Sequence, residues 1–230
     1  MPVIQYRSRV YPTHSSVPGN QLTSMSLAGL PGVVDGDHLF AMLHASNLNL
    51  SPRWVPPAGW AEVISARDAT RDISLFHKIA HGEPGNYVFN ISAETASYCG
   101  GFLICYTGAS RTLALDSAGA SFRYSATDPV ADAINVTDAN AALLFFNTNN
   151  KANVPDLVPP AGMTVTADTG QGASFGYGAH SCCQLIPSGA GNTGLKYASL
   201  PSGDQNWSVL VALASTTRDP TGGALHFCEA

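Results

Sequence analysis

Part of this chain occurs twice. One stretch begins at Asp35 and reaches Val55-Pro-Pro-Ala-Gly59, and a second begins at Asp138 and reaches Val158-Pro-Pro-Ala-Gly162. The two starting points are 103 positions apart (138 − 35), and so are the two Val-Pro-Pro-Ala-Gly blocks (158 − 55). The two stretches therefore align without a gap. An internal repeat indicates that one structural unit is built twice, and each copy then tests the interpretation of the other.

Short runs of β-branched and aromatic residues alternate with clusters of Gly, Pro, Asn and Asp, and helical periodicity is nearly absent. This pattern predicts an all-β fold, an antiparallel β-sandwich of jelly-roll-like type built from two sequence-related halves. The strands expected in the first half are Leu22–Leu27, His38–Ser46, Ala61–Ala66, Ile73–Ile79, Tyr87–Ser92 and Gly100–Tyr106. Those expected in the second half are Ser121–Ser125, Ala141–Asn147, Met163–Ala167, Ser174–Cys182, Gly194–Ala198 and Ser208–Ala214.

The repeated Pro-Pro-Ala-Gly block predicts a corner between two strands in each half. Proline donates no hydrogen bond to a strand ladder, and glycine permits a sharp turn. The residues expected at these structural corners are Pro56, Pro57, Gly59, Pro159, Pro160 and Gly162.

The repeat also suggests how the chain is divided. We expect an N-terminal arm over residues 1–20, a β-sandwich over 21–215 with halves at about 21–107 and 121–215, and a C-terminal tail over 216–230. The favoured arrangement is one double-sheet sandwich in which each half supplies strands to both sheets, because no linker separates the halves. Two small sandwiches in tandem are the alternative.

Composition excludes some classes of protein. Charged residues make up 12% of the chain, and the net charge of −5 with only 11 Lys and Arg argues against nucleic-acid binding, which needs a basic patch. No apolar run reaches the roughly 18–20 residues of a membrane span, so we expect no membrane partner. The N-terminus lacks the apolar core of a signal peptide, which indicates synthesis in the cytoplasm.

Three patterns resemble catalytic or metal sites, and each has a simpler explanation. Gly172-Ala-Ser-Phe-Gly176 matches a hydrolase elbow around Ser174, but a strand follows it where that elbow needs a helix. His77 and His81 have the spacing of a metal pair on a helix but flank the end of a strand. Asp35-Gly-Asp37 lacks the further acidic ligands of a calcium loop. We therefore predict no enzyme activity and no catalytic, cofactor or metal site.

Exposed tryptophan rings can stack on sugar faces, so the three tryptophans are candidates for a sugar-binding site. Trp54 aligns with Leu157 and Trp60 with Met163, so both positions are apolar in both halves, which favours packing over ligand binding. Trp207 precedes the last strand and lies in one of three Asn-x-Ser/Thr sequons, a number near chance in a chain this rich in Asn and Ser.

The five cysteines are odd in number. Cys99 and Cys105 are expected in one strand, roughly 20 Å apart at ~3.3 Å per residue, too far for a disulfide that needs Cα atoms within about 7 Å. Cys182 and Cys183 are neighbours that point to opposite faces. Two interpretations stay open: five reduced thiols, or an intermolecular disulfide through Cys228 once the protein reaches an oxidising exterior.

The order of motifs resembles a duplicated β-sandwich module of bacteriophage virion and tail-associated structural proteins, also found in bacterial surface proteins. The matching segments are Asp35-Gly-Asp-His-Leu-Phe-Ala41, Pro56-Pro-Ala-Gly-Trp60, Leu75-Phe-His-Lys-Ile-Ala80 and Phe102-Leu-Ile-Cys-Tyr-Thr-Gly108. The resemblance runs from about Leu22 to Ala214, and the departures are Met163 in place of a second Trp, the extra cysteines and the N-terminal arm. It implies a fold and no catalytic residues.

The resemblance implies a non-enzymatic virion protein on the particle exterior, as a capsid decoration, fibre or tail-associated protein. Its expected partners are other virion proteins, bound through the N-terminal arm, and further copies of itself in a homo-oligomer. The alternative is a module that binds a carbohydrate or host receptor, such as a host surface glycan, through its loops. The loops Asn47–Trp54 and Asn147–Leu157 are the expected contacts, because the repeat places them at one end of the sandwich.

Overall fold

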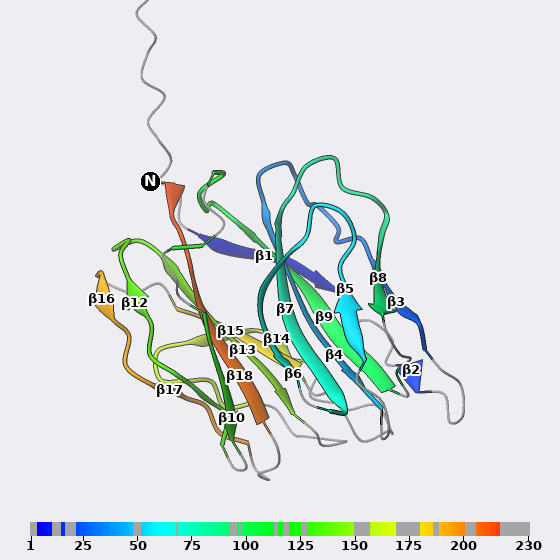
Figure 1. The fold of residues 1–230 in the computed structure, drawn as a ribbon. Coiled ribbons are helices and arrows are strands. Elements are labelled where there is room, and N and C mark those ends of the chain that lie inside the picture. Colours follow the sequence, from blue (N-terminus) through cyan, green and yellow to red (C-terminus); the bar gives the residue numbers. More distant parts are fainter. Residues whose placement is uncertain are drawn as a thin grey trace, which may run out of the picture.

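A computed structural model describes residues 4–10, 15–16, 22–47, 52–67, 69–92, 96, 98–112, 115–116, 120–125, 128–149, 157–168, 180–185, 189–200 and 206–216. These residues form antiparallel strands in layers that lie face to face (Figure 1), so the predicted all-β sandwich is confirmed.

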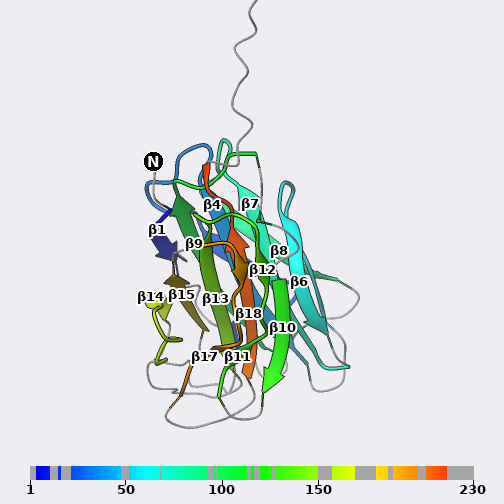
Figure 2. The same ribbon diagram turned by 90° about the vertical axis from the view of Figure 1, so that its left-hand side faces the viewer.

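Two large sheets form the middle layers. The first large sheet has the order β1 (Gln5–Val10), β9 (Tyr98–Thr107), β4 (His38–Ser46), β7 (Arg71–Ile79) and β6 (Ala61–Arg67), with β2 (Ser15–Ser16) also paired to β9. The second large sheet has the order β10 (Ala120–Ser125), β18 (Asn206–Leu213), β13 (Ala142–Asn149), β15 (His180–Leu185) and β14 (Thr164–Asp168). Figure 2 shows the second large sheet from its side of the molecule.

Smaller sheets cover the outer faces. The outer sheet of the first half joins β3 (Ser24–Ala28), β8 (Asn86–Ser92) and β5 (Arg53–Val55). In the second half, β11 (Val130–Ala131) pairs with β17 (Lys196–Tyr197), and β12 (Asn135–Val136) pairs with β16 (Gly191–Asn192). The chain crosses between layers at most connections, as in a jelly roll.

Each large sheet takes its strands from one part of the chain. The first uses residues up to Thr107 and the second uses residues from Ala120 onward. The favoured arrangement, in which each half supplies strands to both sheets, is therefore wrong. Within each part, local connections join one large sheet to its own outer strands. The two parts then share one apolar core between the large sheets.

This central core is built by both large sheets. The first large sheet contributes Phe40, Met42, Ile73, Leu75, Phe102, Ile104 and Tyr106, and the second contributes Ala142, Leu144, Phe146, Ala167, Trp207, Val209, Val211 and Leu213. The ring of Phe146 lies 5.5 Å from that of Phe40 and 6.1 Å from that of Phe102, between centroids. Alternate residues of the same strands face outward into a second core in each half.

The ungapped alignment of the repeat is wrong at the start of β4 and β13. The turn before β4 closes when the Asp37 N–H donates to the Val34 carbonyl, and the turn before β13 closes when the Ala141 N–H donates to the Asp138 carbonyl. These turns are 104 positions apart (141 − 37), not 103.

The extra position decides which side chains face the central core. A shift of one residue turns a strand's whole side-chain set to the opposite face of its sheet. Phe40 corresponds to Leu144, and both lie in the central core, whereas the alignment at 103 would have matched Phe40 to the outward-facing Leu143.

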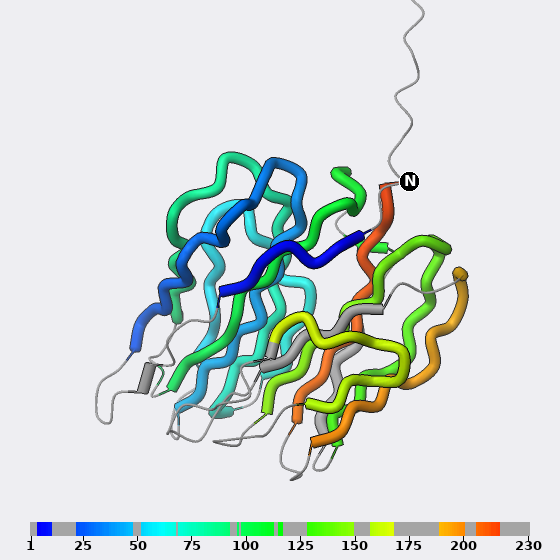
Figure 3. The backbone as a smooth tube through the Cα atoms, turned by 180° about the vertical axis from the view of Figure 1, so that it is seen from behind, coloured from blue at the N-terminus to red at the C-terminus, as the bar shows by residue number. Residues whose placement is uncertain are grey.

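The N-terminal segment folds onto its own chain. β1 pairs with β9 from Gln5 opposite Thr107 to Val10 opposite Leu103, and Ile4 is 2% exposed in the central core. Arg9 donates a hydrogen bond to the Thr166 carbonyl of the second large sheet. Over residues 4–10, the segment expected as an arm for a partner subunit is therefore an edge strand of this protein, seen crossing the molecule in Figure 3.

The central core predicts that the two parts unfold together. Phe146→Ala should lower the free energy of unfolding by about 3–5 kcal/mol, because it empties the contact between the large sheets. Urea denaturation followed by tryptophan fluorescence and by far-UV circular dichroism measures this, and the two probes should report one transition. Val158→Ala, at an exposed position, is the control and should change stability by less than about 0.5 kcal/mol. Two separate transitions in the wild-type chain would contradict a shared core.

Candidate functional site

The central core becomes polar at the end where β4 and β13 finish. Met42, His44 and Ser46 alternate along β4 and therefore face the same side of the first large sheet. Thr148 of β13 is paired with Trp207 of β18 on the second large sheet. The last inward-facing positions thus carry an imidazole and two hydroxyls in place of aliphatic groups.

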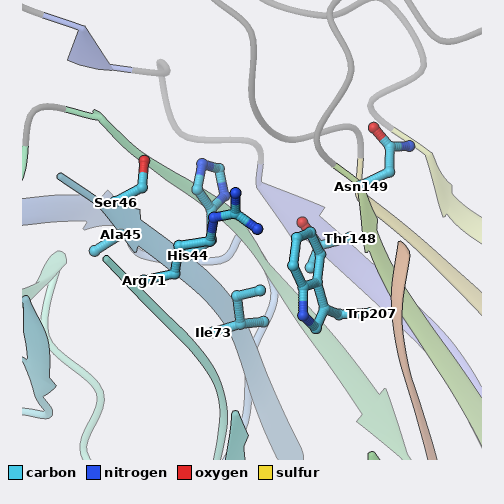
Figure 4. Close-up of a pocket in the computed structure, with 8 residues that line it drawn as sticks. All are labelled: His44, Ala45, Ser46, Arg71, Ile73, Thr148, Asn149 and Trp207. Atoms are coloured by element: carbon cyan, nitrogen blue, oxygen red, sulfur yellow. The ribbon is translucent and has the colours of Figure 1, made fainter. Parts of the chain in front are cut away.

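These ends surround a pocket between the two large sheets (Figure 4). Its volume is about 240 Å³ including the open mouth, and its interior has room for about one water-sized group. The surface that a ligand would touch is almost entirely apolar. The lining residues are His44, Ala45, Ser46, Arg71, Ile73, Thr148, Asn149 and Trp207.

Arg71 and Trp207 contact each other across this pocket. The Arg71 guanidinium carbon lies 5.2 Å from the centroid of the Trp207 ring, the distance of a cation–π contact. The two residues belong to different large sheets, and Figure 4 shows the guanidinium between the His44 ring and the indole. Arg71 is the only Arg, Lys, Asp or Glu among the described residues that line the pocket.

Ser46 also lines the pocket. Its side-chain oxygen is buried and has no hydrogen-bond partner among the described residues. A buried hydroxyl without a partner costs free energy unless a water or a ligand supplies one.

Acidic residues near the site serve the fold. Asp72, next to Arg71 in β7, is fully buried and accepts hydrogen bonds from the Trp54 backbone N–H, 2.9 Å away, and from Arg67. At the other end of the molecule, Asp138 accepts from the backbone N–H of Ser215 at 2.7 Å and from its hydroxyl. Each buried carboxylate satisfies backbone donors, which is a structural role.

A pair of histidines is buried at the opposite end of β4. His38 Nδ1 lies 2.9 Å from His77 Nε2, and His38 Nε2 lies 2.5 Å from the Ser110 carbonyl oxygen. Since a carbonyl only accepts, His38 Nε2 carries the hydrogen in its contact with Ser110. Burial, followed by the neighbouring His38, lowers the pKa of His77 to about 3. The His77 ring is therefore neutral near pH 7.

Neither of the two metal patterns brings its own residues together. His77 is buried against His38, while the exposed His81 ring contacts Asp35 at 3.1 Å. Asp37 is buried and forms an ion pair with Arg7 at 2.8 Å. No group of three or more His, Cys, Asp and Glu suited to a metal ion occurs among the described residues.

The repeated corners are turns with similar geometry. Trp60 N–H donates to the Pro57 carbonyl at 3.2 Å, and Met163 N–H donates to the Pro160 carbonyl at 2.9 Å. Gly59 has a φ of 85° and Gly162 a φ of 80°, a region that favours glycine. Pro56 and Pro159 stand one residue earlier in each turn and are half-buried.

The tryptophans of the first half pack in its outer core. Trp54 is 4% exposed and Trp60 is 7% exposed, and their repeat partners Leu157 and Met163 are equally buried. The prediction that these positions serve packing is therefore confirmed. Trp207 lies inside β18 and not before it, and it faces the pocket.

Two of the cysteines, Cys99 and Cys105, are free thiols. Both lie in β9, and burial raises the pKa of the Cys99 thiol to about 12. Cys182 and Cys183 lie in β15. Ser174 and Cys228 lie outside the described residues, so the elbow motif and the intermolecular disulfide stay untested.

Sequence reasoning missed Arg71, His44 and Ser46 as members of one site. The available signal was the change from the apolar run Leu39–Leu43 to His44-Ala-Ser46 within one predicted strand. Which residues face them across the sheets depends on the register of the second half.

No family model, curated protein or solved structure matches this chain. In the part of the chain that the structure describes, no helix is long and apolar enough to span a membrane.

The His77 environment predicts acid sensitivity. The folded protein binds a proton on His77 only near pH 3, whereas the unfolded chain binds it below its ordinary pKa of 6.5. The contribution of His77 to stability is thus complete above pH 6.5 and is lost as the pH falls from about 6.5 toward 3, by about 2 kcal/mol at pH 5. In urea denaturation, the free energy of unfolding of His77→Gln should fall less between pH 7 and pH 5 than that of the wild-type protein. His81→Gln, at an exposed position, should show the wild-type dependence of the free energy of unfolding on pH.

The Arg71–Trp207 contact predicts a coupling between the two large sheets. A double-mutant cycle of Arg71→Met and Trp207→Leu should give a coupling free energy of about 0.5–1 kcal/mol in urea denaturation. A cycle of Arg53→Met and Trp207→Leu is the control, because Arg53 is exposed on the outer sheet of the first half, and its two effects should add. Additivity in the first cycle would show that the contact contributes nothing.

Proposed function

We propose that this protein is a non-enzymatic structural component of a bacteriophage virion, displayed on the particle exterior after synthesis in the host cytoplasm. The observation that carries the proposal is the shared central core, which joins two β-structured parts into one body through Phe40, Phe102 and Phe146. Such a body suits a protein that works through surface contacts. The motif order of the sequence supports the virion assignment by resemblance.

The described polar groups support a structural role. Asp37, Asp72, Asp116 and Asp138 are all buried, and each binds backbone N–H groups or a basic side chain. The buried His38 and His77 rings are hydrogen-bonded to each other, and His38 is also hydrogen-bonded to the Ser110 carbonyl. These groups hold turns and strand ends in place.

The surface offers contacts for other virion proteins or further copies of the chain. Large apolar side chains are exposed on the outer layers, with Val55 and Val88 in the first half and Val158, Leu195 and Tyr197 in the second. Exposed apolar groups that lie close together favour protein–protein contact. Because residues 4–10 already pair with β9, we place the partner contacts on these outer layers and on the termini beyond the described residues.

Mass spectrometry of purified particles tests the virion assignment. We expect peptides of this chain in particles that survive a high-salt wash. A high copy number per particle would identify a capsid decoration, and a low one would identify a fibre or tail component. Absence of the chain from particles made in cells that express it would contradict the proposal.

A second candidate function is binding of a host-surface glycan. The pocket favours it, because the Trp207 ring lines it at one end of the sandwich. Thr148 and Asn149 of the second loop named from the sequence line the pocket, as does Ser46, which directly precedes the first loop. A glycan array probed with the full chain tests this function.

A further inference from the structure

The outer sheet of the first half exposes one row of side chains across its three strands. Val55 of β5 pairs with Asn90 of β8, which pairs in turn with Ser24 of β3, and all three side chains are exposed. Val88 lies two residues before Asn90 on the same side of β8 and is 45% exposed. Arg53 lies on the same side of β5 as Val55. These five residues are called face one.

The second half builds the same arrangement from its own strands. Val158, the repeat partner of Val55, forms an antiparallel bridge with Ser199. Tyr197 lies two residues before Ser199, where face one has a valine, and is 59% exposed. Asp128 lies opposite Ser199, because a backbone hydrogen bond continues the register of β11 with β17. Face two consists of Asp128, Val158, Leu195, Tyr197 and Ser199, all exposed.

The two faces lie on opposite sides of the molecule. In Figure 1 the outer sheet of the first half is at the right, and β12, β16 and β17 are at the left. The two large sheets and their shared core lie between the faces. One molecule therefore cannot bring its own two faces together, whereas two copies can.

The faces carry opposite charges. Arg53 is the charged residue of face one, and the described residues provide no ion-pair or hydrogen-bond partner for its side chain. Asp128 is the charged residue of face two, and its side chain likewise has no partner among the described residues. Lys196 of β17 points to the other side of its strand and is half-buried. Contact between face one and face two joins opposite charges, whereas contact between two copies of one face joins like charges.

We propose that face one binds face two of a second copy of this chain. The apolar side chains of face one then lie against Val158, Leu195 and Tyr197 of face two. Each copy uses both faces, so the contact is of the head-to-tail kind that produces rings or filaments. This inference deepens the proposed function, because it names the chain itself as the partner of the outer layers.

Sedimentation velocity of the full chain over a range of protein concentrations tests the contact. The wild-type protein should form species larger than a dimer as the concentration rises, because a head-to-tail dimer still has a free face at each end. Val88→Glu on face one and Tyr197→Glu on face two should each weaken self-association about tenfold or more, because the contact would desolvate an unpaired carboxylate. Val34→Glu, at an exposed position in the turn before β4, is the control and should associate like the wild type.

A mixture of the two carboxylate variants identifies which faces meet. Val88→Glu keeps face two and Tyr197→Glu keeps face one, so neither should bind itself, but their mixture should form a one-to-one dimer that grows no further. Binding of face one to itself would instead give dimers of Tyr197→Glu alone. Binding of face two to itself would give dimers of Val88→Glu alone. Either of these dimers would overturn the proposal.

The charge pair provides a second measurement if far-UV circular dichroism shows that a carboxylate variant does not fold. Arg53→Glu should weaken self-association, and Asp128→Arg added in the same chain should restore it. A wild-type chain that stays monomeric at every concentration, or self-association that none of these variants alters, would overturn the inference. A monomeric chain that is nevertheless found in purified particles would leave the virion assignment standing.

Discussion

The contact of Phe146 with Phe40 and Phe102 is the interaction on which the rest of the structure depends. Each large sheet has an outer sheet against one face, and its other face is apolar. That apolar face is removed from water only when the other large sheet covers it. Neither part of the chain can therefore bury its apolar surface completely by itself. The edge strand β1 extends the same interface through Ile4 and Arg9.

The segment between the two parts is fixed to both of them. Ser110 donates its N–H to the Ala214 carbonyl of the second part at 2.9 Å, and its own carbonyl accepts from His38 of the first. A few residues later, Asp116 accepts from the backbone N–H groups of Thr137 and Asp138. The connection therefore holds the parts in one orientation, and the buried His38–His77 pair lies at this joint.

The pocket arises where the central core ends. Toward the middle of β4 and β13, Met42 and Phe146 fill the space between the sheets. Two residues further along each strand, His44 and Thr148 stand in place of apolar side chains, and the space between the two large sheets is no longer completely filled. Arg71 and Trp207 close part of that gap from opposite sides. The same strands thus supply stability in their middle and a candidate binding site at their end.

The sequence by itself determined most of the long strands and the corners, although it placed the strand at His180–Leu185 too early, at Ser174–Cys182. β4 was predicted at its observed bounds, and the repeat correctly assigned Trp54 and Trp60 to packing, because local propensity and turn chemistry act within a few residues. The sequence-based prediction missed the edge strand β1, because that strand depends on pairing with the distant β9. Only the tertiary structure decided the one-residue offset between β4 and β13 and the meeting of Arg71 with Trp207. Side chains alternate between faces, so long-range register and sheet packing, and not the residues themselves, select which of them face one another.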